Sequence, residues 1–182
     1  LAKKLGLMRN FGFSGYDNVI YIGTNGKMTE VCAAMGLTSI EAMDDFVRIN
    51  FRNYNAYKSG LDGVPGIRLI EYDASEKNNY QYIIIEADES RCGLSRDSLV
   101  QILHDNNILA RRYFYPGCHR MEPYRSYYPQ SDLWLEETAK VAGRVISLPN
   151  GTAVDENAIG KICDLIRCAV IHETRLPSGQ DL

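Results

Sequence analysis

The sequence predicts an α/β fold, and three observations carry this prediction. Residues 40–61 place apolar side chains at steps of three and four, as in a long amphipathic helix. Residues 66–72 and 80–87 are rich in Ile and Tyr and flank a polar turn, which is typical of an antiparallel hairpin. Helical periodicity also precedes and follows a short apolar strand at 145–148. We therefore expect one α/β unit after an N-terminal helical extension.

The composition is that of an ordinary globular domain. With 182 residues, 45% of them hydrophobic and 24% charged, the chain can bury a good-sized core. A net charge of −3 excludes the broad basic field of a non-specific nucleic-acid binder. No apolar run approaches the ~20 residues that span a bilayer. We therefore expect neither a nucleic-acid nor a membrane partner.

The cysteines and histidines suggest a reduced, metal-free protein. The five cysteines form no CxxC pair, and their odd number leaves one unpaired in any disulfide scheme. We expect free thiols and a cytoplasmic location. The adjacent Cys118 and His119 cannot form a metal site alone, and no other histidine has a partner at ligand spacing. We expect no metal.

The chain begins with a short helix, because Leu1, Leu5 and Met8 share one helical face. This helix is expected to end near Asn10, and the glycines of FGFSGYDN at 11–18 predict a loop. The first residue is not methionine, and the pattern opens inside an amphipathic helix. We therefore expect the chain to be a piece of a longer protein.

The next stretch, VIYIGTNGKMTEVCAAM at 19–35, joins an apolar run, a glycine-bounded loop and a helical pattern. Gly23 and Gly26 lack a Cβ, so backbone N–H groups could close on an anion at the positive end of the following helix. Asn25 adds a side-chain amide, and Lys27 adds a charge. This combination favours a phosphate ligand.

Three interpretations of this loop stay open on the residues alone. The first is a P-loop of an ATP-dependent ligase, suggested by GTNGK followed by a hydroxyl residue. Met28 then occupies the place of the magnesium-binding Ser or Thr, Thr29 comes one residue late, and Tyr21 replaces a glycine. The second is a phosphate loop of a pyridoxal-phosphate enzyme, which needs no magnesium ligand. The third is a strand-to-helix turn without a ligand.

Two helices are expected after the loop. Thr38 and Glu41 predict a capping box for the second, whose roughly twenty residues span ~30 Å, enough to bridge two domains, line a dimer interface or form a core helix. The first is expected to pack into the core through a face made of Met28, Val31, Cys32 and Met35.

In the second half, Ser95 predicts the N-cap of a helix that ends at 106–107. Residues 108–130 are aromatic, basic and proline-bearing with little periodicity, and long irregular loops in compact domains are often functional. A helix over 133–141 and a final helix from about Asp155 flank the strand at 145–148. The tail at 176–182 is expected to fray.

Five of these segments resemble the sugar aminotransferases of the DegT/DnrJ/EryC1/StrS family, in the family's order: LAKKLGLMRNFGF, GTNGKMTEVCAAMGL, NYQYIII, RRYFYPGCHRMEPY and ISLPNG. These are pyridoxal-phosphate enzymes with the aspartate aminotransferase fold. The resemblance covers nearly the whole chain and is far more specific than one glycine-rich loop. It favours the pyridoxal-phosphate interpretation over the ligase.

The resemblance implies that the chain is the C-terminal part of such an enzyme. Residues 1–38 would end the large domain with the cofactor-phosphate loop, residues 39–61 would form the long connecting helix, and residues 62–182 a small α/β domain with an antiparallel sheet flanked by helices. In the family, the Schiff-base lysine precedes the stretch that corresponds to Leu1. None of the seven lysines here sits in that motif. We therefore predict no catalytic residue in this chain, which alone would be inactive.

For the cofactor, the resemblance implies a homodimer whose site is shared across the interface. Asn25 resembles the asparagine that reaches the pyridoxal phosphate of the neighbouring subunit, with Gly26 beside it. Lys27 either assists electrostatically or is simply solvated.

For the substrate, Tyr115 and His119 resemble pocket residues that face the sugar nucleotide. Its diphosphate suits Arg111, Arg112 or Arg120, with aromatic residues nearby for the base. The parent reaction would be a ping-pong transamination from an amino donor, usually glutamate, to a nucleotide-linked keto-deoxysugar. The alternatives are a catalytically silent dimerisation module and, third, the ATP-dependent ligase.

Overall fold

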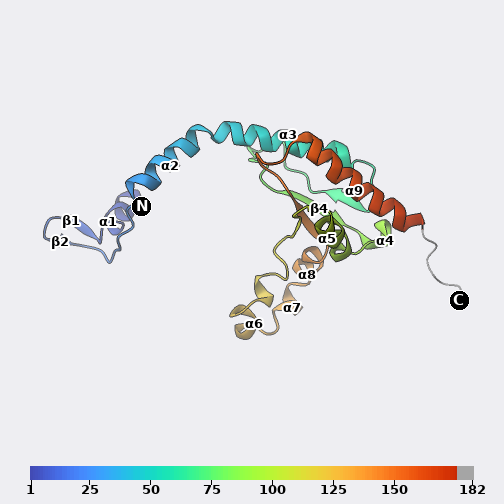
Figure 1. Cartoon of the computed structure of the whole chain (residues 1–182). Coiled ribbons are helices and arrows are strands. Elements are labelled where there is room, and N and C mark those ends of the chain that lie inside the picture. The colour runs from blue at the N-terminus through green and yellow to red at the C-terminus, as the bar shows by residue number, and fades with distance from the viewer. Residues whose placement is uncertain (176–182) are drawn as a thin grey trace. The chain divides into compact units, whose positions relative to one another are not determined.

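The computed structural model of the chain describes residues 1–175 (Figure 1). Two compact units, Leu1–Asp44 and Asp45–Leu182, divide it, and each is described by itself. The predicted frayed tail at 176–182 lies outside the described residues. No helix in the described part of the chain is both long and apolar enough to cross a membrane.

The first unit combines two helices with a small ribbon. Its elements are α1 (Ala2–Met8), β1 (Phe13–Gly15), β2 (Asn18–Val19) and α2 (Glu30–Glu41). The short helix α1 confirms the prediction. The predicted loop at 11–18 was wrong, because β1 and β2 pair there as antiparallel strands. A 2.8 Å hydrogen bond from Asn18 Nδ2 to Ser14 Oγ holds their turn.

Helix α2 begins as the sequence suggests but is not packed. The hydroxyl of Thr29 caps it by accepting a hydrogen bond from the Cys32 N–H at 3.3 Å. Met28 and Val31 are each 70% exposed, and Met35 is 68% exposed. The prediction of core packing for this face was therefore wrong within the first unit.

The predicted capping box at Thr38 was also wrong. Thr38 lies inside α2, where its hydroxyl donates to the Ala34 carbonyl at 3.2 Å. Ala42 separates α2 from α3 (Met43–Leu61), so the amphipathic helix begins later than predicted. Its buried face holds Asn53, Tyr54, Tyr57 and Leu61.

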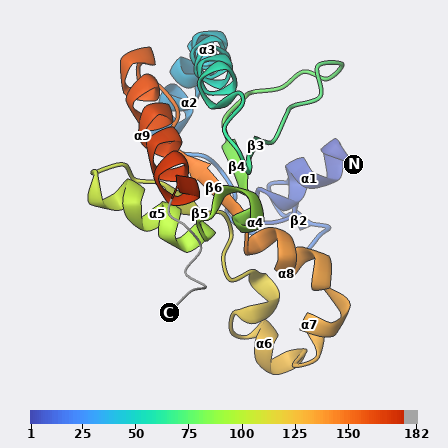
Figure 2. The same cartoon turned by 90° about the vertical axis from the view of Figure 1, so that its right-hand side faces the viewer.

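The second unit is built on a four-stranded antiparallel sheet in the order β3–β4–β6–β5 (Figure 2). Its strands are β3 (Ile67–Leu69), β4 (Ile83–Ala87), β5 (Arg111–Arg112) and β6 (Val145–Leu148). The predicted hairpin is confirmed as β3 paired with β4, and the predicted strand at 145–148 as β6. β5 was not predicted.

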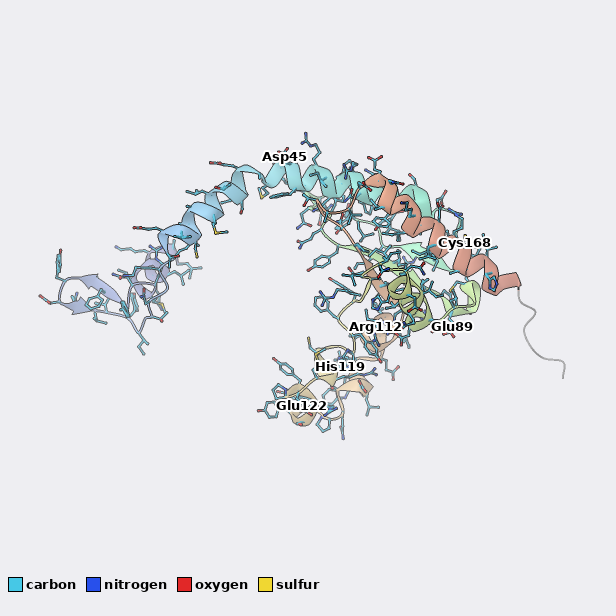
Figure 3. The ribbon with its side chains drawn as sticks, in the orientation of Figure 1. Asp45, Glu89, Arg112, His119, Glu122 and Cys168 are labelled. Carbon is cyan, nitrogen blue, oxygen red and sulfur yellow. The ribbon has the colours of Figure 1, made fainter. Side chains whose placement is uncertain are left out.

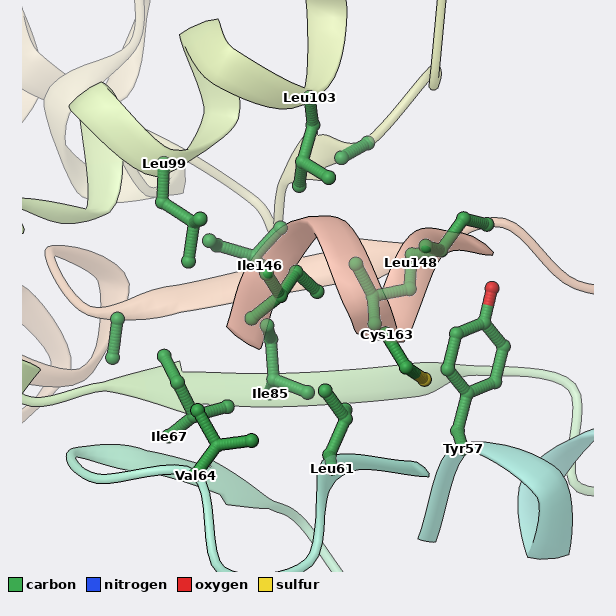
Figure 4. Packing of buried hydrophobic residues seen from close by; sticks show 14 of the residues in the cluster. Tyr57, Leu61, Val64, Ile67, Ile85, Leu99, Leu103, Ile146, Leu148 and Cys163 are labelled. Carbon is green, nitrogen blue, oxygen red and sulfur yellow. The ribbon is translucent and has the colours of Figure 1, made fainter. Parts of the chain in front are cut away.

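Helices complete the core of the second unit. They include α4 (Glu89–Cys92), α5 (Arg96–Asp105) and α9 (Glu156–Arg175). Ser95 caps α5 as predicted, accepting from the Ser98 N–H at 3.0 Å. Figure 4 shows Leu99 and Leu103 of α5 above Ile146 of β6 and Ile85 of β4, and all four are fully buried. Their burial joins the helices to the sheet.

The stretch between β5 and β6 is more regular than predicted. It contains the 3-10 helix η1 (Cys118–Arg120) and the short helices α6 (Tyr124–Tyr127), α7 (Ser131–Trp134) and α8 (Glu136–Ala142). The prediction of an irregular stretch at 108–130 was thus wrong in part. The single helix predicted at 133–141 is divided into two at Leu135.

Close packing at Gly60 of α3 gives a stability prediction. A Cβ there would lie 2.6 Å from Cys163 Sγ, a buried thiol whose pKa burial raises to about 11. Gly60→Ala should therefore lower the free energy of unfolding by about 1–2 kcal/mol, because overpacking exceeds the gain of up to about 1 kcal/mol in helix propensity. Urea unfolding measures the change.

Gly160 of α9 supplies the matched control, since a Cβ added there would have no other atom within 4 Å. Gly160→Ala should stabilise by about 0.5–1 kcal/mol. In a Cys163→Ala background, the cost of Gly60→Ala should fall, because the sulfur at 2.6 Å is gone and only the Cβ of residue 163, at 3.0 Å, remains close. A cost that is undiminished in that background would show that the sulfur is not the cause.

Candidate functional site

A cavity of about 940 Å³ lies in the second unit, within the size range of small-molecule sites. Its walls come from the segment after β5, from η1 and α6, and from α7, α8 and the start of β6. We call it the aromatic groove, because aromatic and aliphatic side chains dominate its lining. Representative members are Tyr113, Phe114, His119, Tyr128, Trp134 and Val141.

His119, labelled in Figure 3, is one of the residues that line this groove and gives it a polar side chain. Its side chain is only 8% exposed, and Nε2 lies 3.0 Å from Asp132 Oδ1. Within residues 1–172 this contact is not aligned as a hydrogen bond, yet the His119 ring still interacts with the carboxylate and helps to lower the pKa of Asp132. A buried ring nitrogen of this kind is costly unless a ligand satisfies it.

Gly117 makes room for this ring. Its φ of +97° favours glycine, and a Cβ at this position would come within 2.7 Å of His119 Cε1. Any side chain at position 117 would collide with the His119 ring, so this position of the imidazole requires glycine at 117.

Asp132 joins two residues that the sequence singled out. The Nε of Arg120 donates to Asp132 Oδ1 at 2.8 Å, and His119 approaches the same oxygen. The hydrogen bond from Arg120 is the main reason that the pKa of the Asp132 carboxyl is held below its ordinary value of 3.8. Any stability from this pair is present above pH 3.8 and is lost as the pH falls through the lower folded-state pKa.

Arg120→Gln should accordingly raise the pKa of Asp132 toward 3.8, measured by NMR titration of the side-chain carboxyl. Glu122 is an internal control, since its pKa is lowered by Ser126 and then Arg125, without Arg120. A value for Asp132 that does not move in Arg120→Gln would contradict the assigned cause.

Tyr115 and Arg112 form a second group. The guanidinium carbons of Arg96 and Arg112 lie 4.6 and 5.2 Å from the centroid of the Tyr115 ring. Arg112 NH1 lies 3.7 Å from Asp97 Oδ1, which also accepts a 2.7 Å hydrogen bond from Arg96 Nε. The predicted substrate residues thus fall into two pairs, Arg112 with Tyr115 and His119 with Arg120. Arg111 pairs with β6 in the sheet.

Sequence reasoning missed Arg96, Asp97 and Asp132. Arg96 and Asp97 sit in the first turn of α5, where charged residues are usually solvent-exposed. Asp132 follows a proline-bearing turn that has no periodicity. Only the folded contacts reveal their roles.

In the first unit, the Gly23 to Lys27 loop differs from an anion cradle. The Gly26 N–H already donates to the carbonyls of Arg9 and Thr24, at 2.9 and 3.0 Å. A Cβ at Gly23 would lie 2.4 Å from the Met8 carbonyl oxygen. These glycines therefore allow close packing on the end of α1, and the predicted backbone cradle for an anion was wrong at Gly26.

The side chains of this loop remain available. The Asn25 backbone bridges to Asn10, while its exposed side-chain amide has no hydrogen-bond partner among the described residues. Lys27 Nζ lies 5.8 Å from the Phe11 ring centroid. Met28 follows Lys27 directly and the hydroxyl of Thr29 caps α2, so no free hydroxyl stands at the place where a P-loop binds magnesium, which argues against the ligase interpretation.

Comparison with known proteins identifies the class. The model of the DegT/DnrJ/EryC1/StrS aminotransferase family matches residues 1–167, so the chain belongs to that family. The resemblance seen in the sequence is confirmed.

Two curated relatives are both called dTDP-4-amino-4,6-dideoxy-D-glucose transaminase. The protein from Shigella dysenteriae is 32% identical over 169 residues, which are 92% of this chain and 45% of the relative. The one from Escherichia coli is 33% identical over 159 residues, 87% of this chain and 43% of the relative. The chain therefore spans less than half the length of these relatives.

A solved structure supports the fold. DesI, crystallised in the presence of its TDP-sugar product, superposes with a TM-score of 0.80 at 40% identity, over 93% of this chain and 43% of DesI. The predicted fold class, an α/β C-terminal portion of the aminotransferase fold, is confirmed.

Proposed function

We propose that the full-length protein carrying this chain is a pyridoxal-phosphate-dependent aminotransferase of a nucleotide-linked keto-deoxysugar, with glutamate as amino donor. The observation that carries the proposal is the family match over residues 1–167. The transaminase from Shigella dysenteriae, which aligns with 92% of the chain, supports a dTDP-linked sugar as substrate.

The chain offers a donor that suits the cofactor's phosphate. The free amide of Asn25 can donate to a phosphate oxygen, and Lys27 adds positive charge nearby. Gly26 would serve by its small size and not by its N–H, which is occupied. When bound, pyridoxal phosphate supplies the electron sink that amino transfer requires. The role of this chain is to hold and orient.

The substrate would meet the second unit. The aromatic groove offers a mainly apolar lining to a sugar or base, and His119 Nε2 can exchange a hydrogen bond with a hydroxyl group. Tyr115 offers an aromatic ring, while Arg112 and Arg120 offer guanidinium groups to a diphosphate.

The proposal includes a domain division and an assembly. Residues 1–38 would complete the large domain, residues 39–61 would connect the domains, and residues 62–182 would form the small domain. A homodimer would place Asn25 against the cofactor of the partner subunit. The exposed apolar side chains of α2 support burial against further protein. The five free thiols support a cytoplasmic location.

The test uses the full-length protein with pyridoxal phosphate, glutamate and a panel of dTDP- and GDP-linked keto-deoxysugars. Mass spectrometry should detect an amino sugar and an equal amount of 2-oxoglutarate. Turnover of none of these sugars by cofactor-loaded protein would refute the proposal. The isolated chain is the control for the silent-module alternative, and we expect no turnover from it.

A further inference from the structure

Arg96 is a buried arginine that the proposed mechanism does not use. It is the first residue of α5, and its side chain is only 3% exposed. Its Nε donates to Asp97 Oδ1 at 2.7 Å, and its NH1 donates to the Ala142 carbonyl at 2.7 Å and more weakly to the Val145 carbonyl at 3.4 Å. A guanidinium is retained in such a place only when several partners hold it.

Two of these partners belong to one wall of the aromatic groove. Ala142 ends α8 and Val145 begins β6, and both residues line the groove. The Ala142 carbonyl is one of the last carbonyls of α8, which lack partners within their helix. Arg96 supplies the donor and a positive charge at that negative helix end.

A further contact of Arg96, to an aromatic ring, leads to another part of the groove lining. The Arg96 guanidinium carbon lies 4.6 Å from the ring centroid of Tyr115, which stands two residues before Gly117 and four before His119. Gly117 and His119 line the same groove as Ala142 and Val145. One guanidinium therefore touches the end of α8, the start of β6 and the segment that carries the buried imidazole.

We propose that Arg96 is a positioning residue of the nucleotide-sugar site, which sets the separation of these two parts of the groove lining and so the place of His119. The proposal rests on the proposed function. Arg96 needs no contact with the substrate and acts through Tyr115, Ala142 and Val145.

Lysine cannot replace this arginine. Its ammonium could donate to one carbonyl. It has no planar group to stack on the Tyr115 ring, and it lacks the separate Nε–H that donates to Asp97. Arg96→Lys should thus keep the charge and the fold while loosening the groove. In the full-length enzyme it should raise the KM for the nucleotide sugar about tenfold and leave the KM for glutamate within about twofold. A purely structural role would change both substrates together.

Substitutions of Tyr115 test the same contact between Arg96 and the Tyr115 ring. Tyr115→Leu removes the ring, and Tyr115→Phe retains it, because no hydrogen bond of the Tyr115 hydroxyl contributes to the stack. If Arg96 acts through Tyr115, the losses of sugar affinity should not add. The Arg96→Lys/Tyr115→Leu double variant should then have the same affinity as whichever single variant binds the sugar less tightly. Binding of dTDP by calorimetry gives a readout that needs no turnover.

Arg68→Lys is the matched control, since Arg68 is an exposed arginine of β3 paired with Glu86, outside the groove. It should change neither KM nor dTDP binding. Equal KM increases for both substrates in Arg96→Lys, or additive losses in the double variant, would overturn the proposal. If Arg96→Lys does not fold, Arg96→Gln, which keeps a planar group and an N–H donor for the Ala142 carbonyl, is tested by the same KM split. Absence of turnover in the wild-type enzyme would instead refute the proposed function.

Discussion

Replacing Asn53 with alanine should lower the free energy of unfolding by about 2–4 kcal/mol. The Asn53 amide is fully buried on α3 and donates to Asn150 Oδ1 at 3.0 Å and to the Gly151 carbonyl at 3.1 Å. Asn150 in turn donates to the carbonyl of Tyr80 at 2.7 Å. Alanine would leave these half-buried acceptors without their donor and would remove the side-chain hydrogen bonds that join the segment after β6 to α3.

Asn55 lies on the same helix, is exposed and forms no side-chain hydrogen bond in the described residues, so Asn55→Ala is the matched control. It should change the stability by less than about 0.5 kcal/mol. Asn53→Asp should also lower the stability, because it loses the donor to Asn150 and Gly151, although it keeps the oxygen that accepts from the Arg52 guanidinium at 2.9 Å. Equal urea midpoints for Asn53→Ala and Asn55→Ala would show that the network carries no stability.

Local signals were enough for the regular elements of the second unit. The hairpin of β3 and β4, the strand β6 and the Ser95 cap of α5 each depend on residues close in sequence, and all were predicted. Periodicity and capping are local properties, so they survive without knowledge of the tertiary structure.

Elements whose burial depends on distant partners were not predictable. The apolar residues of α2 suggested a core helix, yet their exposure shows that no part of the first unit covers them. The predicted capping box at Thr38 was wrong because Thr38 lies inside α2, where its hydroxyl donates to the Ala34 carbonyl. Sequence alone cannot tell which helix a capping residue belongs to when two helices are separated by only Ala42.

The candidate site shows the same limit. The aromatic, basic composition of 108–130 pointed to function, but the pairing of His119 with Asp132 and of Tyr115 with Arg96 joins residues from different elements. At the first-unit loop, composition suggested backbone donors for an anion, whereas Gly26 donates to Arg9 and Thr24. The side chain of Asn25 is the donor that remains.

Replacing Asn25 with alanine in the full-length dimer should weaken retention of pyridoxal phosphate by roughly ten- to a hundredfold. The loss corresponds to one hydrogen bond to a charged group, worth about 1.5–3 kcal/mol. Because the Asn25 side chain is exposed and unpartnered in the described structure, protein stability should hardly change. Cofactor absorbance after dialysis measures retention, and Asn18→Ala, which removes only a hairpin contact, is the control.

Asn25→Asp should be worse than Asn25→Ala, since it sets a carboxylate against a phosphate dianion. The proposed contact crosses the dimer interface, so a mixing experiment can locate it. Subunits with Asn25→Ala are exchanged with subunits that lack the Schiff-base lysine. In the heterodimer, the site with the intact lysine also receives an intact Asn25, and activity should return. Activity that stays absent after proven subunit exchange would place Asn25 outside a shared site.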